Sequence, residues 1–318
     1  MRVSLVIPYF GPLPRFFPLF VQSASRNPRL NFVFVSNEEV PVRLPPNFNY
    51  VRLTPAEVEN RVREKVCQDF RLWYGYKLCD VKPFYGVVFD DLLKTSDFWG
   101  YCDIDLVFGD LSSLLDSQTL NGADFYCADA GPVVATFCLF RNQERVNRLP
   151  FQIPDFQRRL ASKEYESTDE KEFDKLIRGG IDINYVKPTS LRQSQLSISS
   201  DGRMVGRTQG VVGDPNEFYW SDGRTFVKAP GSDPQEVLYL HFIGLKRSYH
   251  WTGYDPNTQY EEFSFSAAGF LPWRTPPTAI ARIKHYTKVT ALRTISWARS
   301  QVAKRLSTRF RHKLKSRF

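Results

Sequence analysis

The chain has 318 residues, of which 42% are apolar and 15% aromatic, so it can build a substantial hydrophobic core and is not disordered throughout. Its net charge of +9 is uneven, because residues 274–318 carry 13 Lys and Arg and no Asp or Glu, which leaves a mildly acidic body. The five cysteines include no Cys-x-x-Cys pair and indicate reduced thiols rather than disulfides or a zinc site. No apolar run reaches the roughly 18 residues of a membrane span, and the first apolar run is too short for a signal peptide, so we expect a cytoplasmic protein.

Short apolar runs alternate with amphipathic segments along the first part of the chain. Strands are expected at 3–7, 31–37 and 49–53, with a helix after the first of them. A second helix begins at Thr54, where Glu57 is in the capping-box position. Near-continuous apolar strands that alternate with helices favour an α/β sheet covered on both faces.

The same pattern continues through the middle of the chain. We expect the segment 76–83 to open a helix that runs to about residue 94, with Asp80 as its N-cap and Pro83 in its first turn, and then a strand that starts at Phe98. Two further strands at 124–128 and 135–140 follow.

The last third of the body has a different pattern, in which short strands and hairpins predominate. A helix is expected over 168–177, two hairpins lie within a hairpin-rich subregion at 183–235, and a final strand covers 237–243. These elements predict one α/β domain over residues 1–272. The remaining residues, 273–318, form a basic tail with apolar residues at four-residue spacing, the pattern of an amphipathic helix that suits an anionic membrane surface; a solvated, partly disordered tail is the alternative.

Asp103 and Asp105 interrupt the apolar run 98–111, and Asp110 follows shortly after. Asp103 and Asp105 must be paired, protonated or bound to a cation if they lie inside a buried strand, because burying an unpaired carboxylate costs several kcal/mol. Alternate residues of a strand point to the same face, so we expect the two side chains to converge and to seat a hard divalent cation. An isolated Asp-x-Asp is usually structural or solvated, but this setting favours a site that neutralises a diphosphate.

His241, near the end of the last strand, is the candidate third metal ligand; the alternative is a histidine satisfied within the core. It is followed by Gly244 and by the cations Lys246 and Arg247. A ligand, a glycine that allows close approach and two cations within seven residues favour a diphosphate site.

Other charged residues lie at the expected helix starts. Lys77 and Lys82 flank one start, where the helix dipole favours anions, and are candidates for contact with phosphate or ribose; the alternative is an exposed first turn. Asp169 and Glu170 are either ordinary N-terminal helix charges or residues that bind an acceptor or act as a general base. Asp129 is a comparable candidate with less support.

Five segments together resemble a mostly bacterial, little-characterised family of GT-A-type glycosyltransferases. They occur in the same order as in that family and span about residues 1–250. The segments are Ile7–Gly11, Tyr76–Pro83, Phe98–Leu111, Leu139–Asn142 and Leu240–Lys246.

The resemblance implies a GT-A-like fold, with a Rossmann-like mixed central sheet flanked by helices. It implies transfer of a sugar, expected to be a hexose, from a nucleotide-sugar donor, expected to be a UDP-sugar, to a saccharide or lipid-linked saccharide. The family's Asp-x-Asp motif, here Asp103 and Asp105, implies Mn²⁺ or Mg²⁺ held against the donor diphosphate.

The resemblance also implies roles for individual residues. His241 and Gly244 match the H-x-x-G-x-x-K motif of glycogenin-like and lipopolysaccharide galactosyltransferase enzymes, in which the histidine binds metal. Position 247 is Arg and Lys stands one place early, which leaves open which cation touches the leaving phosphate. Asp169 and Glu170 are similar to an acidic pair near the acceptor. The residues implied near the nucleoside are Pro8, Tyr9, Phe10 and Asn37.

Two other functions fit parts of the sequence. A metal-dependent phosphodiester or pyrophosphate hydrolase would use the same carboxylates, and a requirement for an acceptor separates it from a transferase. A nucleic-acid-binding protein would use the basic tail, but the acidic body and the lack of a nucleic-acid motif argue against it. A tail held on anionic lipid would place the protein at the inner face of the membrane, as a peripheral protein.

Overall fold

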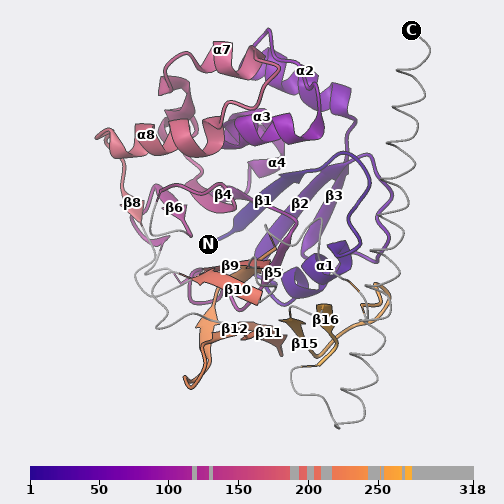
Figure 1. Ribbon diagram of the computed structural model, residues 1–318. Coiled ribbons are helices and arrows are strands. Elements are labelled where there is room, and N and C mark those ends of the chain that lie inside the picture. Colours follow the sequence, from indigo (N-terminus) through magenta and orange to yellow (C-terminus); the bar gives the residue numbers. More distant parts are fainter. Residues whose placement is uncertain are drawn as a thin grey trace, which may run out of the picture.

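The computed structural model shows a mixed α/β protein whose strands form sheets of seven, four and five strands (Figure 1). It describes residues 1–116, 120–128, 132–186, 193–198, 204–208, 217–242, 251, 254–266 and 269–273. The basic tail from residue 274 onward lies outside these residues, so the boundary at 272 and membrane binding by the tail stay predictions. In the described part of the chain, none of the helices combines the length and apolarity needed to cross a membrane.

The seven-stranded sheet is the centre of the fold, and its strands have the order β3-β2-β1-β4-β7-β6-β8. The first four are parallel, whereas β7 runs antiparallel to β4 and to β6. The chain runs outward from β1 to β3 and then returns to β4 on the other side of β1. The switch point of an open α/β sheet, where ligands usually bind, therefore lies between β1 and β4. The strands are β1 (Val3–Pro8), β2 (Leu30–Ser36), β3 (Phe48–Arg52), β4 (Phe98–Cys102), β6 (Phe125–Cys127), β7 (Phe137–Arg141) and β8 (Tyr185–Val186).

Helices cover both faces of this sheet, which confirms the expected architecture (Figure 1). One face packs against α1 (Phe17–Ser25), which buries Phe17 and Phe20 as expected. The helices of the other face are α2 (Pro55–Lys65), α3 (Tyr85–Val88), α4 (Asp90–Leu93), α6 (Glu144–Asn147), α7 (Phe156–Ala161) and α8 (Phe173–Arg178), with the 3₁₀ helices η1 (Gly75–Phe84) and η2 (Leu149–Gln152) and the π-helical turn η3 (Thr168–Glu172). The capping box at Thr54 is confirmed, because its side chain accepts from the N–H of Glu57 at 3.2 Å and its own N–H donates to the Glu57 carboxylate at 2.7 Å.

The expected continuous helix from the segment 76–83 to about residue 94 is wrong. The segment forms η1, followed by the short helices α3 and α4. Pro83 lies inside η1 and has no N–H to donate, which disfavours a regular α-helix there. Asp80 is not an N-cap but is fully buried within η1.

The expected single strand beginning at Phe98 is also divided. It ends at Cys102, and the chain crosses to β5 (Leu106–Phe108), which belongs to the four-stranded sheet β10-β9-β14-β5. Asp103 and Asp105 therefore lie in a link between two sheets and not on one face of a strand. The other members of this sheet are β9 (Gln193–Ile198), β10 (Met204–Thr208) and β14 (Tyr239–His241).

The five-stranded sheet has the order β13-β12-β11-β15-β16. It lies at the end of the described structure opposite α2 and α8 (Figure 1). One expected hairpin is confirmed, because β11 and β12 pair antiparallel around Asp222 and Gly223, whose φ angles of +47° and +79° suit a type I′ turn. The other is confirmed by the antiparallel pairing of β9 with β10, although its turn is outside the described residues. The strands are β11 (Glu217–Ser221), β12 (Arg224–Lys228), β13 (Gln235–Val237), β15 (Glu262–Ser266) and β16 (Gly269–Leu271).

Candidate functional site

A cavity of about 600 Å³ opens at the carboxyl ends of β1 and β4, at the switch point of the large sheet. This volume is in the range of small-molecule sites. The polar and aromatic side chains that line it come from six separate parts of the chain. They include Tyr9, Phe10, Tyr74, Tyr76, Cys79, Lys82, Asp103, Asp105, Thr136, Tyr165, Asp169, Glu170 and His241.

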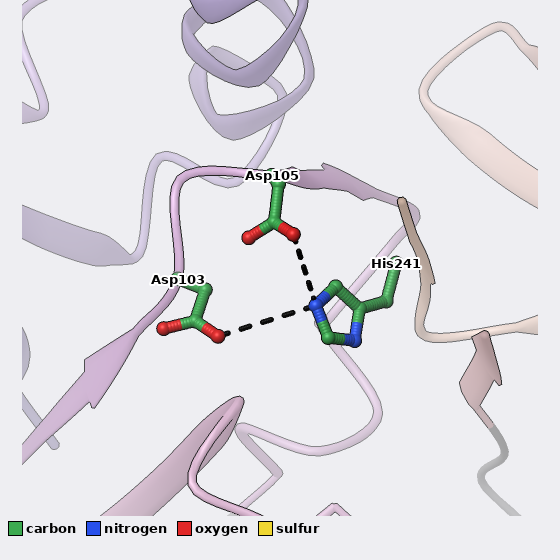
Figure 2. A group of neighbouring side chains, drawn as sticks. All are labelled: Asp103, Asp105 and His241. Atoms are coloured by element: carbon green, nitrogen blue, oxygen red, sulfur yellow. Dashed lines mark ion pairs between the residues drawn. The ribbon is translucent and has the colours of Figure 1, made fainter. Parts of the chain in front are cut away.

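Three of these side chains form a candidate metal centre (Figure 2). One ligand atom each from Asp103, Asp105 and His241 lies within 4.8 Å of the others. His241 Nε2 is 3.1 Å from Asp105 Oδ2 and 4.0 Å from Asp103 Oδ2. The predicted set of three metal ligands is therefore assembled in one place.

Strand pairing explains why residues so distant in sequence meet. Strand β14 runs antiparallel to β5, and His241 pairs with Leu106, the neighbour of Asp105. The N–H of Phe242 donates to the Asp105 carbonyl at 3.0 Å, and the N–H of Asp103 donates to the Thr136 carbonyl at 3.0 Å. The link that carries both carboxylates is thus fastened at each end to backbone of a different sheet.

The donor set suits a hard or borderline divalent cation, since it offers two carboxylate oxygens and one imidazole nitrogen. His241 is buried, and neither of its ring nitrogens has a hydrogen-bond partner among the described residues. Buried polar atoms normally have such a partner, so within the described part of the chain the imidazole nitrogens are available to a ligand beside the two carboxylates. The residues present therefore fit a metal ion.

Lys82 lies between the metal centre and a second acidic group. Its ammonium donates to Asp103 Oδ1 and to the Ala135 carbonyl, both at 2.7 Å, and lies 4.0 Å from Asp169 Oδ2. Burial by itself lowers the pKa of Lys82, but the negative charges around it, that of Asp103 foremost, outweigh burial and raise the pKa well above its usual value. The side chain therefore stays charged. It occupies one oxygen of Asp103 and leaves Oδ2 toward His241.

Asp169 forms the second acidic group. It is buried, and its Oδ1 accepts a hydrogen bond from the Tyr165 hydroxyl at 2.8 Å. Burial raises the pKa of Asp169 to about 7, although Lys82 and Tyr165 act in the opposite direction. A carboxylate with this pKa can accept or return a proton near neutral pH. Glu170 also lines the cavity, and its Oε1 accepts from the N–H of Ala135 at 3.3 Å.

Some predicted site residues do not lie in the cavity. Lys77 is fully buried, and its ammonium donates to Asp80 and to the carbonyls of Arg159 and Glu164, so its predicted contact with the donor does not fit its position. Asn37 is exposed just after β2 and is not among the side chains that line the cavity. Three predicted residues lie outside the described residues: Asp129, Lys246 and Arg247.

The sequence reasoning missed several residues of the cavity. Tyr165 and Tyr76 line it, and their rings pack edge to face at 5.0 Å. Asp80 lies outside it but accepts from the N–H groups of Glu166 and Thr168, which holds the chain just before Asp169. A usable signal for Tyr165 was its spacing of four residues from Asp169. Nothing local indicates the role of Asp80, because its partners are 86 and 88 residues away.

The fold and site together define an α/β protein with a mixed central sheet and an Asp–Asp–His centre at its switch point. Residues 5–272 match a family described as "Family of unknown function (DUF6625)", and the chain belongs to that family. Comparison with curated proteins gives no match.

Two glycosyltransferases are among the solved structures that are similar to this chain. GlyE of Streptococcus pneumoniae TIGR4 is 14% identical over 60% of this chain and 46% of its own, with a TM-score of 0.34, so the similarity spans less than half of GlyE. The galactosyltransferase LgtC, solved with donor and acceptor sugar analogues, is 10% identical over 61% of this chain and 76% of its own, with a TM-score of 0.35. Similarities this distant do not establish an activity, which has to be inferred from the site itself.

Proposed function

We propose that the protein is a divalent-metal-dependent glycosyltransferase of the GT-A type, which moves a sugar, expected to be a hexose, from a nucleotide-sugar donor to a saccharide or lipid-linked saccharide. The observation that carries the proposal is the convergence of Asp103, Asp105 and His241 at the switch point, beside a cavity that also holds Lys82 and Asp169. A site of this kind combines fixed positive charge for a departing diphosphate with a carboxylate for the incoming hydroxyl.

The metal would be held by Asp103 Oδ2, Asp105 and His241. When bound, it would supply Lewis-acid neutralisation of the donor diphosphate. The imidazole favours Mn²⁺ over Mg²⁺, because Mg²⁺ prefers an all-oxygen environment. Lys82 fixes Asp103 from the opposite side and adds a permanent positive charge to this wall of the cavity.

The acceptor side would be formed by Asp169 and Glu170. Asp169, with its pKa near 7 and its hydrogen bond from Tyr165, is poised to take a proton from a sugar hydroxyl. The loop after β1, which contributes Pro8, Tyr9 and Phe10 to the cavity wall, is proposed to contact the nucleoside, expected to be uridine.

The first test measures stabilisation of the protein by UDP with and without Mn²⁺, followed by UDP release from UDP-sugars. We expect Mn²⁺ to tighten UDP binding at least about tenfold, about 1.4 kcal/mol, and Asp105→Ala to remove this gain, since it deletes one of three ligands. The matched control is Asp69→Asn, which alters an exposed acid outside the cavity and should behave as the wild type. Equal metal dependence in Asp105→Ala and the wild type would contradict the metal role.

Hydrolysis of a diphosphate or phosphodiester would use the same carboxylates, so turnover must be measured with and without a saccharide acceptor. Transfer predicts that UDP release rises when an acceptor is added. A rate that is independent of acceptors, with free sugar as the product, would favour the hydrolase instead.

A further inference from the structure

Three aromatic side chains stand exposed within four residues at the start of η1. Trp73, Tyr74 and Tyr76 are 55%, 39% and 60% exposed. Among the described residues, Met1 is the other large hydrophobic side chain exposed to this degree. Single exposed apolar residues are ordinary, but a contiguous group of them marks an interaction site.

This aromatic rim, defined as Trp73, Tyr74 and Tyr76, is continuous with the cavity. Tyr74 and Tyr76 both line it. The ring of Tyr76 packs against that of Tyr165 at 5.0 Å, and the Tyr165 hydroxyl donates to Asp169. The rim therefore leads directly to the acidic side of the site.

The backbone under the rim is firmly held, so the exposure is built into the fold. The N–H of Leu72 donates to Glu59 at 2.9 Å, and the N–H of Lys77 donates to the Tyr74 carbonyl at 3.0 Å. Gly75 lies against the loop after β1, because a Cβ at this position would approach the Phe10 carbonyl to 3.3 Å. A fixed aromatic surface loses little conformational entropy when a ligand binds.

We propose that the aromatic rim binds a sugar ring of the saccharide acceptor and presents one of its hydroxyls to Asp169. A pyranose has one face of C–H groups, which packs favourably on the electron-rich face of an aromatic ring, while its hydroxyls need polar partners at the edge. The rim offers both, since its rings are exposed and the Tyr76 ring adjoins Tyr165, whose hydroxyl is a polar group at the edge. The inference rests on the proposed function, because it assigns the acceptor of that reaction.

A nucleobase is the other flat ligand that could stack here. The observations favour the acceptor, because the rim adjoins Asp169 and Glu170, two acidic groups that suit a sugar hydroxyl better than a diphosphate. Lys82, which suits the diphosphate, donates to Asp103 of the metal centre and lies 4.0 Å from Asp169 Oδ2.

The experiment is saturation-transfer NMR with three soluble probes: methyl β-D-galactopyranoside, methyl β-D-glucopyranoside and lactose. We expect at least one to receive saturation from the wild-type protein, and the signal to fall at least about threefold in Trp73→Ala combined with Tyr76→Ala. Trp73→Phe is the matched control and should keep most of the signal, because it keeps an aromatic face. Both side chains are more than half exposed, so folding should be preserved, which thermal unfolding checks.

The stabilisation of each variant by UDP with Mn²⁺ is measured in parallel and should equal that of the wild type. Three results would overturn the proposal: no saturation of any probe by the wild type, an unchanged signal in the double variant, or a loss of UDP binding in that variant, which would place a nucleobase on the rim. Failure of the wild type to bind UDP would instead remove the proposed function, and saccharide binding at the rim would still be measurable.

Discussion

The segment η1 contains two lysines that each pair with an aspartate, and the two pairs lie in opposite surroundings. Lys77 and Asp80 are both fully buried, 2.9 Å apart, and the ammonium has two backbone carbonyls as further partners. Lys82 and Asp103 are 2.7 Å apart, but their side chains are 10% and 28% exposed to the cavity. The first is a sealed pair, and the second is an open pair.

The difference shows that one interaction type can serve two purposes five residues apart. In the sealed pair every strong partner is internal, so the charges fasten η1 to the chain before Asp169. In the open pair one oxygen of Asp103 remains directed toward the metal centre, so the interaction with Lys82 orients Asp103 and thereby prepares the site for a metal ion. Buried ion pairs are poor sources of net stability and are better understood by what they position.

Breaking the sealed pair should give the largest effect on stability. Asp80→Ala leaves the Lys77 ammonium buried without its counter-charge, and loss of one partner of such a pair costs about 3–5 kcal/mol. Urea unfolding measures this change in the free energy of unfolding. The double variant Lys77→Met, Asp80→Ala should recover much of the loss, because it removes both charges. A decrease below about 1 kcal/mol in the single variant would show that the pair is not sealed as described.

The two pairs also show which contacts could be predicted from the sequence and which could not. Side chains three residues apart in a 3₁₀ helix are eclipsed, so the Lys77–Asp80 contact was available from spacing once the helix type was known. The candidate ligands Asp103, Asp105 and His241 were all predicted, although the argument that placed both carboxylates on one face of a strand was wrong. Their meeting depends on the register of β14 with β5, which pairs His241 with Leu106, 135 positions earlier, and leaves no local signal. The overall α/β order was predictable because apolar periodicity is local.

Asp169, which lies 4.0 Å from the lysine of the open pair, should make folding sensitive to pH. Its pKa is about 7 in the folded protein against a usual value of 3.8, so the folded state holds the proton more tightly than the unfolded state. The contribution of Asp169 to the free energy of unfolding is fully present below about pH 4 and is lost as the pH rises through about 7. Between pH 5 and 8 the wild type should therefore lose about 2–3 kcal/mol more than Asp169→Asn, whose side chain does not titrate. Urea unfolding of both proteins at several pH values measures this difference, and parallel curves would show that Asp169 is already ionised at pH 5.

Replacing the lysine of the open pair should have the smallest effect on stability and the clearest effect on the site. Lys82→Met keeps the volume of the side chain, and Asp103 can still be solvated from the cavity, so we expect a loss of only about 1–2 kcal/mol. Removing a positive charge beside the metal ligands should tighten binding of Mn²⁺ alone by about tenfold, measured by calorimetry, and weaken binding of UDP.

The comparison variant is Lys77→Met, which breaks the sealed pair. It should lose more stability than Lys82→Met yet bind Mn²⁺ as the wild type does wherever it remains folded, because Lys77 does not face the cavity. If both lysine variants changed the affinity for Mn²⁺ equally, the distinction between a pair that fastens the fold and a pair that prepares the site would have to be abandoned. If only Lys82→Met changed it, the charge balance of the metal centre would be assigned to one residue of η1.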